Sequence, residues 1–586
     1  MTKGRVAGIV GNLVTVEVEG PVGQNEIAFV VAPNGDRLMS EVIKVIGTTV
    51  STQVFESTRG LRSGDPVEFT GRPLEAELGP GILSRSFDGI QNDLDRKSGI
   101  FLKRGEYSSP LDHEAIYEFK PLAKAGESVA AGDWLGSVQE NWIDHKIMVP
   151  FAAEGRWRVA SVVGPGRYRV KSTVAVLENE AGERLEVSMV QRWPVKRAIR
   201  AFREKPRPFA VLETGIRIID TFYPMVEGGT GFIPGPFGCG KTVLQQALAK
   251  GAAADIIIIA ACGERANEVV EIFTEFPELT DPRTGRNLME RTTIICNTSN
   301  MPVAAREASV YTAMTIAEYY RSMGLRVLLL ADSTSRWAQA LLEMSNRLEE
   351  LPGPEAFPMD LGAVIGAFYA RAGMVYLNNG ARGAVTFIGT VSPAGGNLRE
   401  PVTENTKRAA RAFYALAQSR ADGKRYPAVD PVDSYSKYWE YPEVQESLTR
   451  AMGPQWVEYV QELRDWVIRG REVQEQINIL GDDGVPLDSH VVFWKAETVD
   501  FALMQQDAFD PIDSLCPLER QRYMLELVRG ICSAEYKFGG HEEVAPWFKQ
   551  VINVLRQMNY TEFESEAFRR YEQELAGFVD ERRAAA

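Results

Sequence analysis

The stretch Gly235-Pro-Phe-Gly-Cys-Gly-Lys-Thr242 decides the fold of this 586-residue chain. Its spacing is G-x-x-x-x-G-K-[ST], in which glycines let the main chain curl so that successive N–H groups point at phosphate oxygens. In this pattern Lys241 reaches the β- and γ-phosphates, and Thr242 offers its hydroxyl to Mg²⁺. The stretch predicts a nucleotide-binding loop made of Gly235, Pro236, Phe237, Gly238, Cys239, Gly240, Lys241, Thr242 and Val243.

The residues around the loop have the order that such a site requires. An apolar strand at 231–234 precedes it, and residues 242–250 read as a helix. Next comes a continuous apolar run from Asp255, typical of a strand buried in a parallel sheet, which ends in Cys262-Gly-Glu-Arg265. Because ligands bind beyond the carboxyl ends of parallel strands, Glu264 is placed to orient or deprotonate a water near the γ-phosphate.

A third apolar strand, Arg326-Val-Leu-Leu-Leu-Ala-Asp332, also ends in an acid. This is the arrangement in which a carboxylate holds Mg²⁺ beside a phosphate-binding loop. A single run of this kind means little, but it follows a nucleotide loop and a strand that ends in Glu264. The three together predict a site for a nucleoside triphosphate and Mg²⁺.

Composition narrows the class of protein. A formal net charge of −14 argues against a broad nucleic-acid surface, so no nucleic-acid partner is expected. No apolar run approaches the roughly 18 residues of a membrane span, and no signal peptide is recognisable. Five cysteines without a C-x-x-C pair suggest reduced thiols in the cytoplasm, and four scattered histidines form no zinc pattern. Mg²⁺ is therefore the only metal that we expect.

Patterns along the chain predict several domains around an α/β P-loop core of the RecA type with a mostly parallel sheet. Short alternating strands separated by glycine and asparagine turns indicate an N-terminal β-barrel, and a second β-rich block interrupts the connection to the core. Helical patterns dominate the C-terminal part. The expected limits are 1–72 for the barrel, 73–110 for a connection, 111–187 for the inserted β-rich domain, 188–437 for the nucleotide-binding domain and 438–586 for the helical domain.

The sequence resembles a known family, the catalytic A subunits (alpha chains) of V/A-type rotary ATPases. Within that family it is most similar to the bacterial V-type ATP synthases. The resemblance covers nearly the whole chain, and the inserted block resembles the extra β domain of A subunits. The motifs that carry it, besides the phosphate loop, are Cys262-Gly-Glu-Arg265, residues 297–309, Ala331-Asp-Ser-Thr-Ser-Arg-Trp-Ala338, residues 77–83, 87–91 and 144–150, and Glu400-Pro-Val-Thr403.

The resemblance implies roles for individual residues. Lys241 and Thr242 would hold ATP or ADP with Mg²⁺, Asp332 would hold Mg²⁺ through water, and Glu264 would activate the hydrolytic water. Arg265 and Arg306 match arginines near the γ-phosphate, although structural ion pairing is an open alternative. Tyr426 matches an aromatic against adenine and Phe509 the opposite wall, with ordinary core packing as the alternative.

The resemblance also implies partners and location. Three such chains would alternate with three B subunits in a ring, joined by central and peripheral stalk subunits to a membrane rotor that carries H⁺ or Na⁺. The complex would lie at the cytoplasmic face of the cell membrane. An arginine finger would come from the neighbouring B subunit, so the isolated chain should be a poor ATPase.

The chain departs from the family pattern at Leu342 and Val364, where arginines are common, and at Asp507, where asparagine is common. None of these positions belongs to the phosphate-binding set. Cys239 reads as a small residue of the phosphate loop, with the alternative that its thiol, near a helix N-terminus, has a lowered pKa and reacts with alkylating agents.

Three other classes of protein remain as alternatives. A hexameric RNA helicase shares the core but needs a nucleic-acid channel. A protein-secretion ATPase should lack the β-rich insertion and form homohexamers. A non-catalytic nucleotide-binding subunit would be expected to lack the intact loop together with Glu264.

Overall fold

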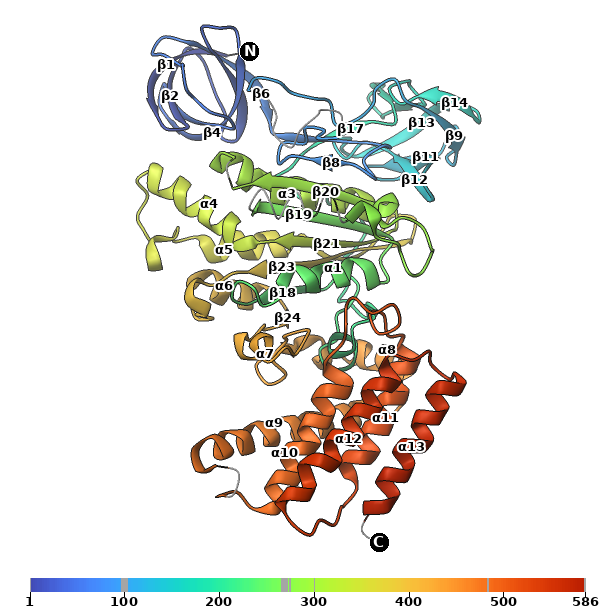
Figure 1. Cartoon of the computed structure of the whole chain (residues 1–586). Coiled ribbons are helices and arrows are strands. Elements are labelled where there is room, and N and C mark those ends of the chain that lie inside the picture. Colours follow the sequence, from blue (N-terminus) through green and yellow to red (C-terminus); the bar gives the residue numbers. More distant parts are fainter. Residues whose placement is uncertain are drawn as a thin grey trace. The chain divides into compact units, whose positions relative to one another are not determined.

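The computed structural model describes residues 2–95, 104–264, 276–299, 301–481 and 484–583, together with Ile272 and Thr274, and only the main chain of Glu264 and Ala394. The chain forms two compact units, each assembled from segments that are distant in the sequence (Figure 1). Unit 1 contains Met1–Arg207, Ala254–Val391 and Arg399–Ala409, and unit 2 contains Pro208–Ala253, Ser392–Leu398 and Ala410–Ala586.

Unit 1 begins with a closed β-barrel whose alternating residues face inward. In β2, Val14 and Val16 are fully buried whereas Glu17 is exposed, because one face of the strand meets the core. Gly11, in the turn between the first two strands, has a φ of +60°, which glycine adopts without strain. The strands, in barrel order, are β1 (Lys3–Val10), β2 (Leu13–Val18), β5 (Thr49–Val54), β4 (Arg37–Ile46), β3 (Glu26–Val31) and β6 (Pro66–Pro73).

A second β-rich block follows as an insertion. The strand before it, β7 (Glu75–Leu78), pairs antiparallel with the strand after it, β17 (Gln191–Pro194), so the block lies between two paired strands as predicted. Two sheets of four strands each make up the block. They are β10 (Ser128–Ala130), β13 (Arg156–Val162), β15 (Ala175–Glu178) and β16 (Arg184–Val187), and β12 (Ile143–Met148), β11 (Trp134–Glu140), β9 (Ile116–Pro121) and β14 (Gly166–Arg169).

The rest of unit 1 is an α/β core. Helix α3 (Val303–Arg321), expected from Ala304 to Met323, is almost wholly buried and packs across four of the strands. The parallel strands, in order, are β23 (Arg382–Val391), β21 (Arg326–Asp332), β19 (Ile256–Glu264), β20 (Thr292–Thr298) and β8 (Ser86–Phe87), and β22 (Gly373–Tyr376) pairs antiparallel with β23. The other helices are α4 (Thr334–Arg347), α5 (Leu361–Tyr369) and α6 (Pro401–Ala409), with short turns η2 (Phe276–Glu278), η3 (Leu288–Arg291) and η4 (Pro354–Ala356).

Unit 2 joins the phosphate loop to a helical domain, drawn in orange to red (Figure 1). Its strands are β18 (Thr230–Pro234), β24 (Ala412–Phe413), parallel to β18, and β25 (Tyr435–Ser436). Its helices are α1 (Lys241–Gly251), α7 (Gln418–Asp422), α8 (Pro442–Met452), α9 (Trp456–Leu480), α10 (Leu487–Val499), α11 (Leu518–Ser533), α12 (His541–Asn559) and α13 (Glu566–Arg582). The short turns are η1 (Ile218–Phe222), η5 (Ala394–Gly396), η6 (Lys437–Glu440) and η8 (Asp500–Met504).

The barrel, the inserted β-rich domain, the α/β core and the helical C-terminal part together confirm the predicted fold class. The two compact units are a different division of the chain from the five predicted domains, and we retain the domain limits as a proposal. Within the described residues, no helix is both long enough and apolar enough to cross a bilayer.

Candidate functional site

The predicted phosphate loop lies between a strand and a helix of unit 2. It follows β18 and leads into α1, whose first residue is Lys241. Gly238 and Gly240 have φ values of +81° and +84°, a conformation that residues with a Cβ rarely adopt. The loop therefore has the curled main chain from which consecutive N–H groups bind phosphates at a helix N-terminus.

Lys241 is held inside this loop. Its Nζ donates to the carbonyl oxygens of Gly235 at 2.8 Å and of Pro236 at 2.7 Å, and it lies 5.2 Å from the ring centre of Phe237. The ammonium group is buried, so its charge is already positioned where an anion enters the loop. Because an ammonium group has three donors, it can turn from carbonyl oxygens to phosphate oxygens without leaving the site.

For Cys239 the reading as a small loop residue stands, and the alternative of a lowered thiol pKa is wrong. Its side chain is buried and its Sγ donates to Oε1 of Gln418 at 3.1 Å. Burial raises the pKa of this thiol, although Lys241 acts in the opposite direction. Removal of the sulfur from water outweighs the favourable field at the start of α1, so Cys239 is not an activated nucleophile. The other cysteines, Cys262, Cys296, Cys516 and Cys532, are buried as well.

A cavity of about 460 Å³ opens beside the loop, within unit 2. Gly240 lines one side, and Tyr426, Phe509 and Asn559 line others. The volume lies in the range of small-molecule sites. Tyr426 packs against the loop so closely that a Cβ on Gly240 would lie 3.8 Å from its ring.

The two aromatic residues are not core residues. Tyr426 is 46% exposed and Phe509 is 84% exposed, which excludes the alternative of ordinary core packing. Exposed aromatic rings beside a cavity offer flat apolar surfaces on which a planar base can stack. The arrangement therefore fits a nucleotide whose phosphates reach the glycine loop.

The predicted acidic residues belong to unit 1, at the carboxyl ends of neighbouring parallel strands. Asp332 ends β21 and Glu264 ends β19, with Asp332 opposite Ala261 in the register. The Asp332 carboxylate is buried, and its Oδ1 accepts from Oγ1 of Thr390 at 2.6 Å. The side chain of Glu264 lies outside the described part of the chain, and so does Arg265.

Arg306 lies in the first turn of α3 and has an acidic partner. Its Nη2 donates to both carboxylate oxygens of Glu343 in α4, each at 3.1 Å. Its stem also covers the end of β19, because a Cβ on Gly263 would lie 3.0 Å from Cδ of Arg306. The contact with Glu343 agrees with the alternative of a structural ion pair, and the contact with Gly263 places the stem next to Glu264 in the chain.

Sequence reasoning missed polar residues that line the cavity, above all Arg217 and Asp513. They form a buried ion pair although they are 296 residues apart in the chain. The nearest local signal is the Gln505-Gln-Asp-Ala-Phe509 segment, which contains the predicted Phe509. No pattern in one sequence connects it to Arg217.

Comparisons with known proteins agree with this geometry. The ATP synthase alpha/beta family nucleotide-binding domain matches residues 215–436, and the beta-barrel domain of that family matches residues 6–71. The barrel-sandwich domain of the ATP synthase alpha/beta subunits matches residues 108–196, and the C-terminal domain of V and A type ATP synthase matches residues 445–537.

Full-length relatives decide the family. The V-type ATP synthase alpha chain of Borrelia recurrentis (strain A1) is 49% identical over 580 residues, with 98% of each chain covered. That of Borreliella afzelii (strain PKo) is 47% identical over 582 residues, with 99% of each covered. The chain belongs to the V-type ATP synthase alpha chains. It is therefore a catalytic, nucleotide-binding subunit of a rotary ATPase or ATP synthase, and it works in a complex with other subunits.

A solved structure shows how far the fold extends beyond this family. The assembled ATPase EscN of the enteropathogenic E. coli type III secretion system aligns with a TM-score of 0.61, covering 90% of this chain and all of that one. At 19% identity this likeness shows the fold alone. The barrel-sandwich match covers the insertion that a secretion ATPase was expected to lack, so the secretion alternative is less supported than the alpha-chain family.

Proposed function

We propose that this alpha chain hydrolyses or makes ATP with Lys241 and Thr242 on the phosphates and Glu264 as the base that activates water. Tyr426 and Phe509 form the walls for adenine. The observation that best supports this is the phosphate loop, which has two glycines at positive φ, a buried Lys241 and a neighbouring cavity with exposed aromatic rings.

The proposed residues suit Mg²⁺ by their chemistry. Mg²⁺ prefers hard oxygen ligands and keeps several waters, so one hydroxyl from Thr242 and a water-mediated contact with Asp332 are appropriate donors. The hydrogen bond from Thr390 fixes the orientation of the Asp332 carboxylate. When bound, Mg²⁺ neutralises charge on the phosphates during transfer.

We propose that Arg265 and Arg306 also act near the γ-phosphate. Arg306 is already paired with Glu343, so its contribution is to support the end of β19 that carries Glu264. A structural role of this kind predicts that Arg306→Lys lowers the rate less than loss of Glu264 does.

We further propose that three copies alternate with three B subunits, and that each B subunit supplies an arginine finger. Central and peripheral stalk subunits then link the ring to a membrane rotor for H⁺ or Na⁺, at the cytoplasmic face of the cell membrane. The membership of the chain in the alpha-chain family supports this assembly.

The test is Mg²⁺-ATP hydrolysis by the chain alone and with its B subunit, each compared with Glu264→Gln. We expect activity to require the B subunit and to fall by about 100-fold or more in the variant, because the base is lost while the phosphate loop is intact. Nucleotide binding should persist in Glu264→Gln. Full activity of the chain alone would instead favour a self-assembling homohexameric motor.

A further inference from the structure

The wall of the cavity that carries Phe509 is an irregular segment. Residues 505–517 connect η8 to α11, and Phe509 projects from this segment with most of its side chain in solvent. Such a side chain is not placed by packing around itself. Its position depends on what holds the main chain of the segment.

A buried ion pair contacts the main chain of this segment. Nη1 of Arg217 and Oδ1 of Asp513 are 2.5 Å apart, with side-chain exposures of 2% and 3%. Arg217 also donates from Nη2 to the carbonyl oxygen of Gln505, and its main-chain N–H donates to Oε1 of Gln506 at 2.8 Å. The donors of Arg217 thus contact the acid and the beginning of the segment.

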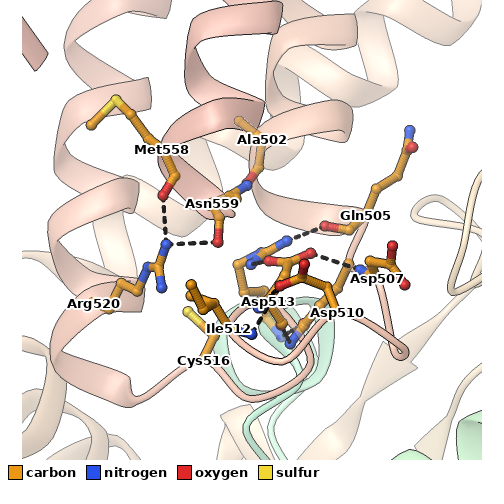
Figure 2. A network of polar contacts seen from close by, with 12 residues as sticks. Ala502, Gln505, Asp507, Asp510, Ile512, Asp513, Cys516, Arg520, Met558 and Asn559 are labelled. Atoms are coloured by element: carbon orange, nitrogen blue, oxygen red, sulfur yellow. Dashed lines mark hydrogen bonds and ion pairs between the residues drawn. The ribbon is translucent and has the colours of Figure 1, made fainter. Parts of the chain in front are cut away.

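Asp513 and Asp507 connect this ion pair to Phe509 through hydrogen bonds. Oδ2 of Asp513 accepts from the main-chain N–H of Asp507 at 2.7 Å, as Figure 2 shows for these labelled residues. Oδ1 of Asp507 in turn accepts from the N–H of Phe509 at 2.9 Å. An unbroken series of hydrogen bonds therefore runs from Arg217 through Asp513 and Asp507 to Phe509.

The segment is also tied to residues 214–217, which contact the helix that follows the phosphate loop. Gln506 donates to the carbonyl oxygens of Gly215 at 2.8 Å and Asp513 at 2.7 Å, which fastens the segment to residues 214–217. The same residues touch the C-terminal end of α1. A Cβ on Gly251 would lie only 2.3 Å from the carbonyl oxygen of Thr214. Residues 214–217 thus contact both α1 and the Phe509 segment.

A buried ion pair by itself is weak evidence for stability, because removal of two charges from water offsets their attraction. This pair is accompanied by hydrogen bonds to the loop, and those bonds define the geometry of the cavity wall. Ligand sites depend on such support, since the groups that touch a ligand must be held within about 0.5 Å of their working positions.

We propose that Arg217 and Asp513 are positioning residues that hold the Phe509 segment at a set distance from the phosphate loop, so that the cavity accepts the purine base of a nucleotide. This inference rests on the proposed function of the cavity. The ion pair acts on the base end of the ligand and leaves the phosphate end to the glycine loop.

The test compares a ligand with a base to one without. Asp513→Asn and Arg217→Lys in the full chain should weaken binding of ATP by about 10- to 100-fold, the range expected for a lost charge-assisted hydrogen bond. Binding of tripolyphosphate, which has no base, should stay within about twofold. With the B subunit present, KM for ATP should rise while kcat changes little, because the displaced segment weakens contacts with the base and not with the phosphates.

Arg291→Lys is the matched control. Arg291 and Asp281 form an equally buried pair in unit 1, with side-chain exposures of 3% and 4%. Asp507→Ala leaves the Arg217–Asp513 pair in place and removes the carboxylate that accepts from the N–H of Phe509. It provides a variant that should fold even if the buried substitutions do not, and it should weaken ATP binding by about threefold.

Three outcomes would overturn the proposal. The first is a parallel loss of ATP and tripolyphosphate affinity in Asp513→Asn, and the second is an equal change in the ATP-to-tripolyphosphate ratio in Arg291→Lys. The third is a ratio of ATP affinity to tripolyphosphate affinity that is unchanged from the wild type in both Asp507→Ala and Arg217→Lys. If the wild-type chain binds ATP no more tightly than tripolyphosphate, the cavity is not the base site, and the proposed function of the cavity fails before the positioning role is tested.

Discussion

Both compact units contain ion pairs with buried carboxylates, but the groups around the pairs differ. In unit 2, Arg217 and Asp513 direct their remaining hydrogen bonds to a segment beside an open cavity. In unit 1, Lys196 bridges Glu41 of the barrel and Glu307 of α3, at 2.9 and 3.1 Å. The ion pair alone does not indicate its role. The further contacts that its members make with other segments indicate whether the pair supports a ligand site or joins domains.

The contacts around α3 repeat the joining pattern. His145 in the inserted domain donates or accepts at Glu140 (2.6 Å) and at the hydroxyl of Tyr319 in α3 (2.8 Å). Arg371 pairs with Glu318 of α3 at 2.6 Å and donates to the carbonyl oxygen of Val195 at 2.7 Å. Substitutions here should lower stability and leave nucleotide affinity unchanged, whereas substitutions at the cavity should lower nucleotide affinity.

Lys241→Ala tests the ligand side and should have the largest effect. Loss of its charge should lower kcat of the complex with the B subunit by about 100- to 1000-fold, because no other group supplies that charge inside the loop. Thermal unfolding should change little, since its partners Gly235 and Pro236 belong to the same loop. Lys250→Ala, in the last turn of the same helix, is the control, and a loss below tenfold in Lys241→Ala would contradict the comparison.

His145→Phe tests the joining side. Burial by itself raises the pKa of Glu140, but His145 and the N–H groups of Leu83 and Gly81 outweigh it and hold this pKa below its usual value. Without His145 a buried carboxylate loses its main partner, and we expect a loss of about 3 kcal/mol, measured as a lower thermal midpoint. The affinity of the folded variant for ATP should equal that of the wild type.

His113→Phe is the matched substitution for this experiment. His113 also contacts a carboxylate, Glu77, at 2.6 Å, but 28% of its side chain is exposed. The loss of stability in His113→Phe should therefore be clearly smaller than the loss in His145→Phe. Equal losses for the two histidines would mean that burial is not what gives His145 its effect.

Glu41→Gln should remove a pH dependence. Burial raises the pKa of Glu41 to about 7, with Lys196 opposing the shift and Glu307 adding to it. The folded protein thus binds this proton more tightly than the unfolded chain, so the associated stability is present below about pH 4.5 and is lost as the pH rises through about 7. The loss should be about 2 kcal/mol, allowing for the coupling to Lys196.

The measurement is the thermal midpoint between pH 5 and pH 8. It should fall with rising pH in the wild type and fall less in Glu41→Gln. Glu19→Gln, an exposed position after β2, should follow the wild-type curve. Parallel curves for Glu41→Gln and the wild type would show that Glu41 is not the group that titrates.

The smallest effect is expected at the surface. Arg450 and Glu446 form an i,i+4 pair on α8 with side-chain exposures of 78% and 74%. Arg450→Ala should change stability by no more than about 0.5 kcal/mol, because solvent screens such pairs. Hydrolysis should be unaffected, and a larger change in either measurement would assign this pair a role in assembly.

Signals that are contiguous in the chain could be predicted from the sequence, and signals that depend on distant partners could not. The phosphate loop, the acid-terminated strands and α3 follow from local spacing, and the family motifs also indicated Tyr426. The pairing of Arg217 with Asp513 depends on the tertiary fold. The environment of Cys239 could not be predicted for a similar reason, since its partner Gln418 comes from another part of unit 2.

The burial of all five cysteines has a practical consequence. Maleimide dyes react with accessible thiolates, so the native chain should label slowly and a single cysteine introduced on an exposed face would be the one fast-reacting position. A fluorophore or a bead could then be attached at one chosen point without first replacing native residues. That would make the chain a ready substrate for single-molecule recordings of how it changes shape during turnover.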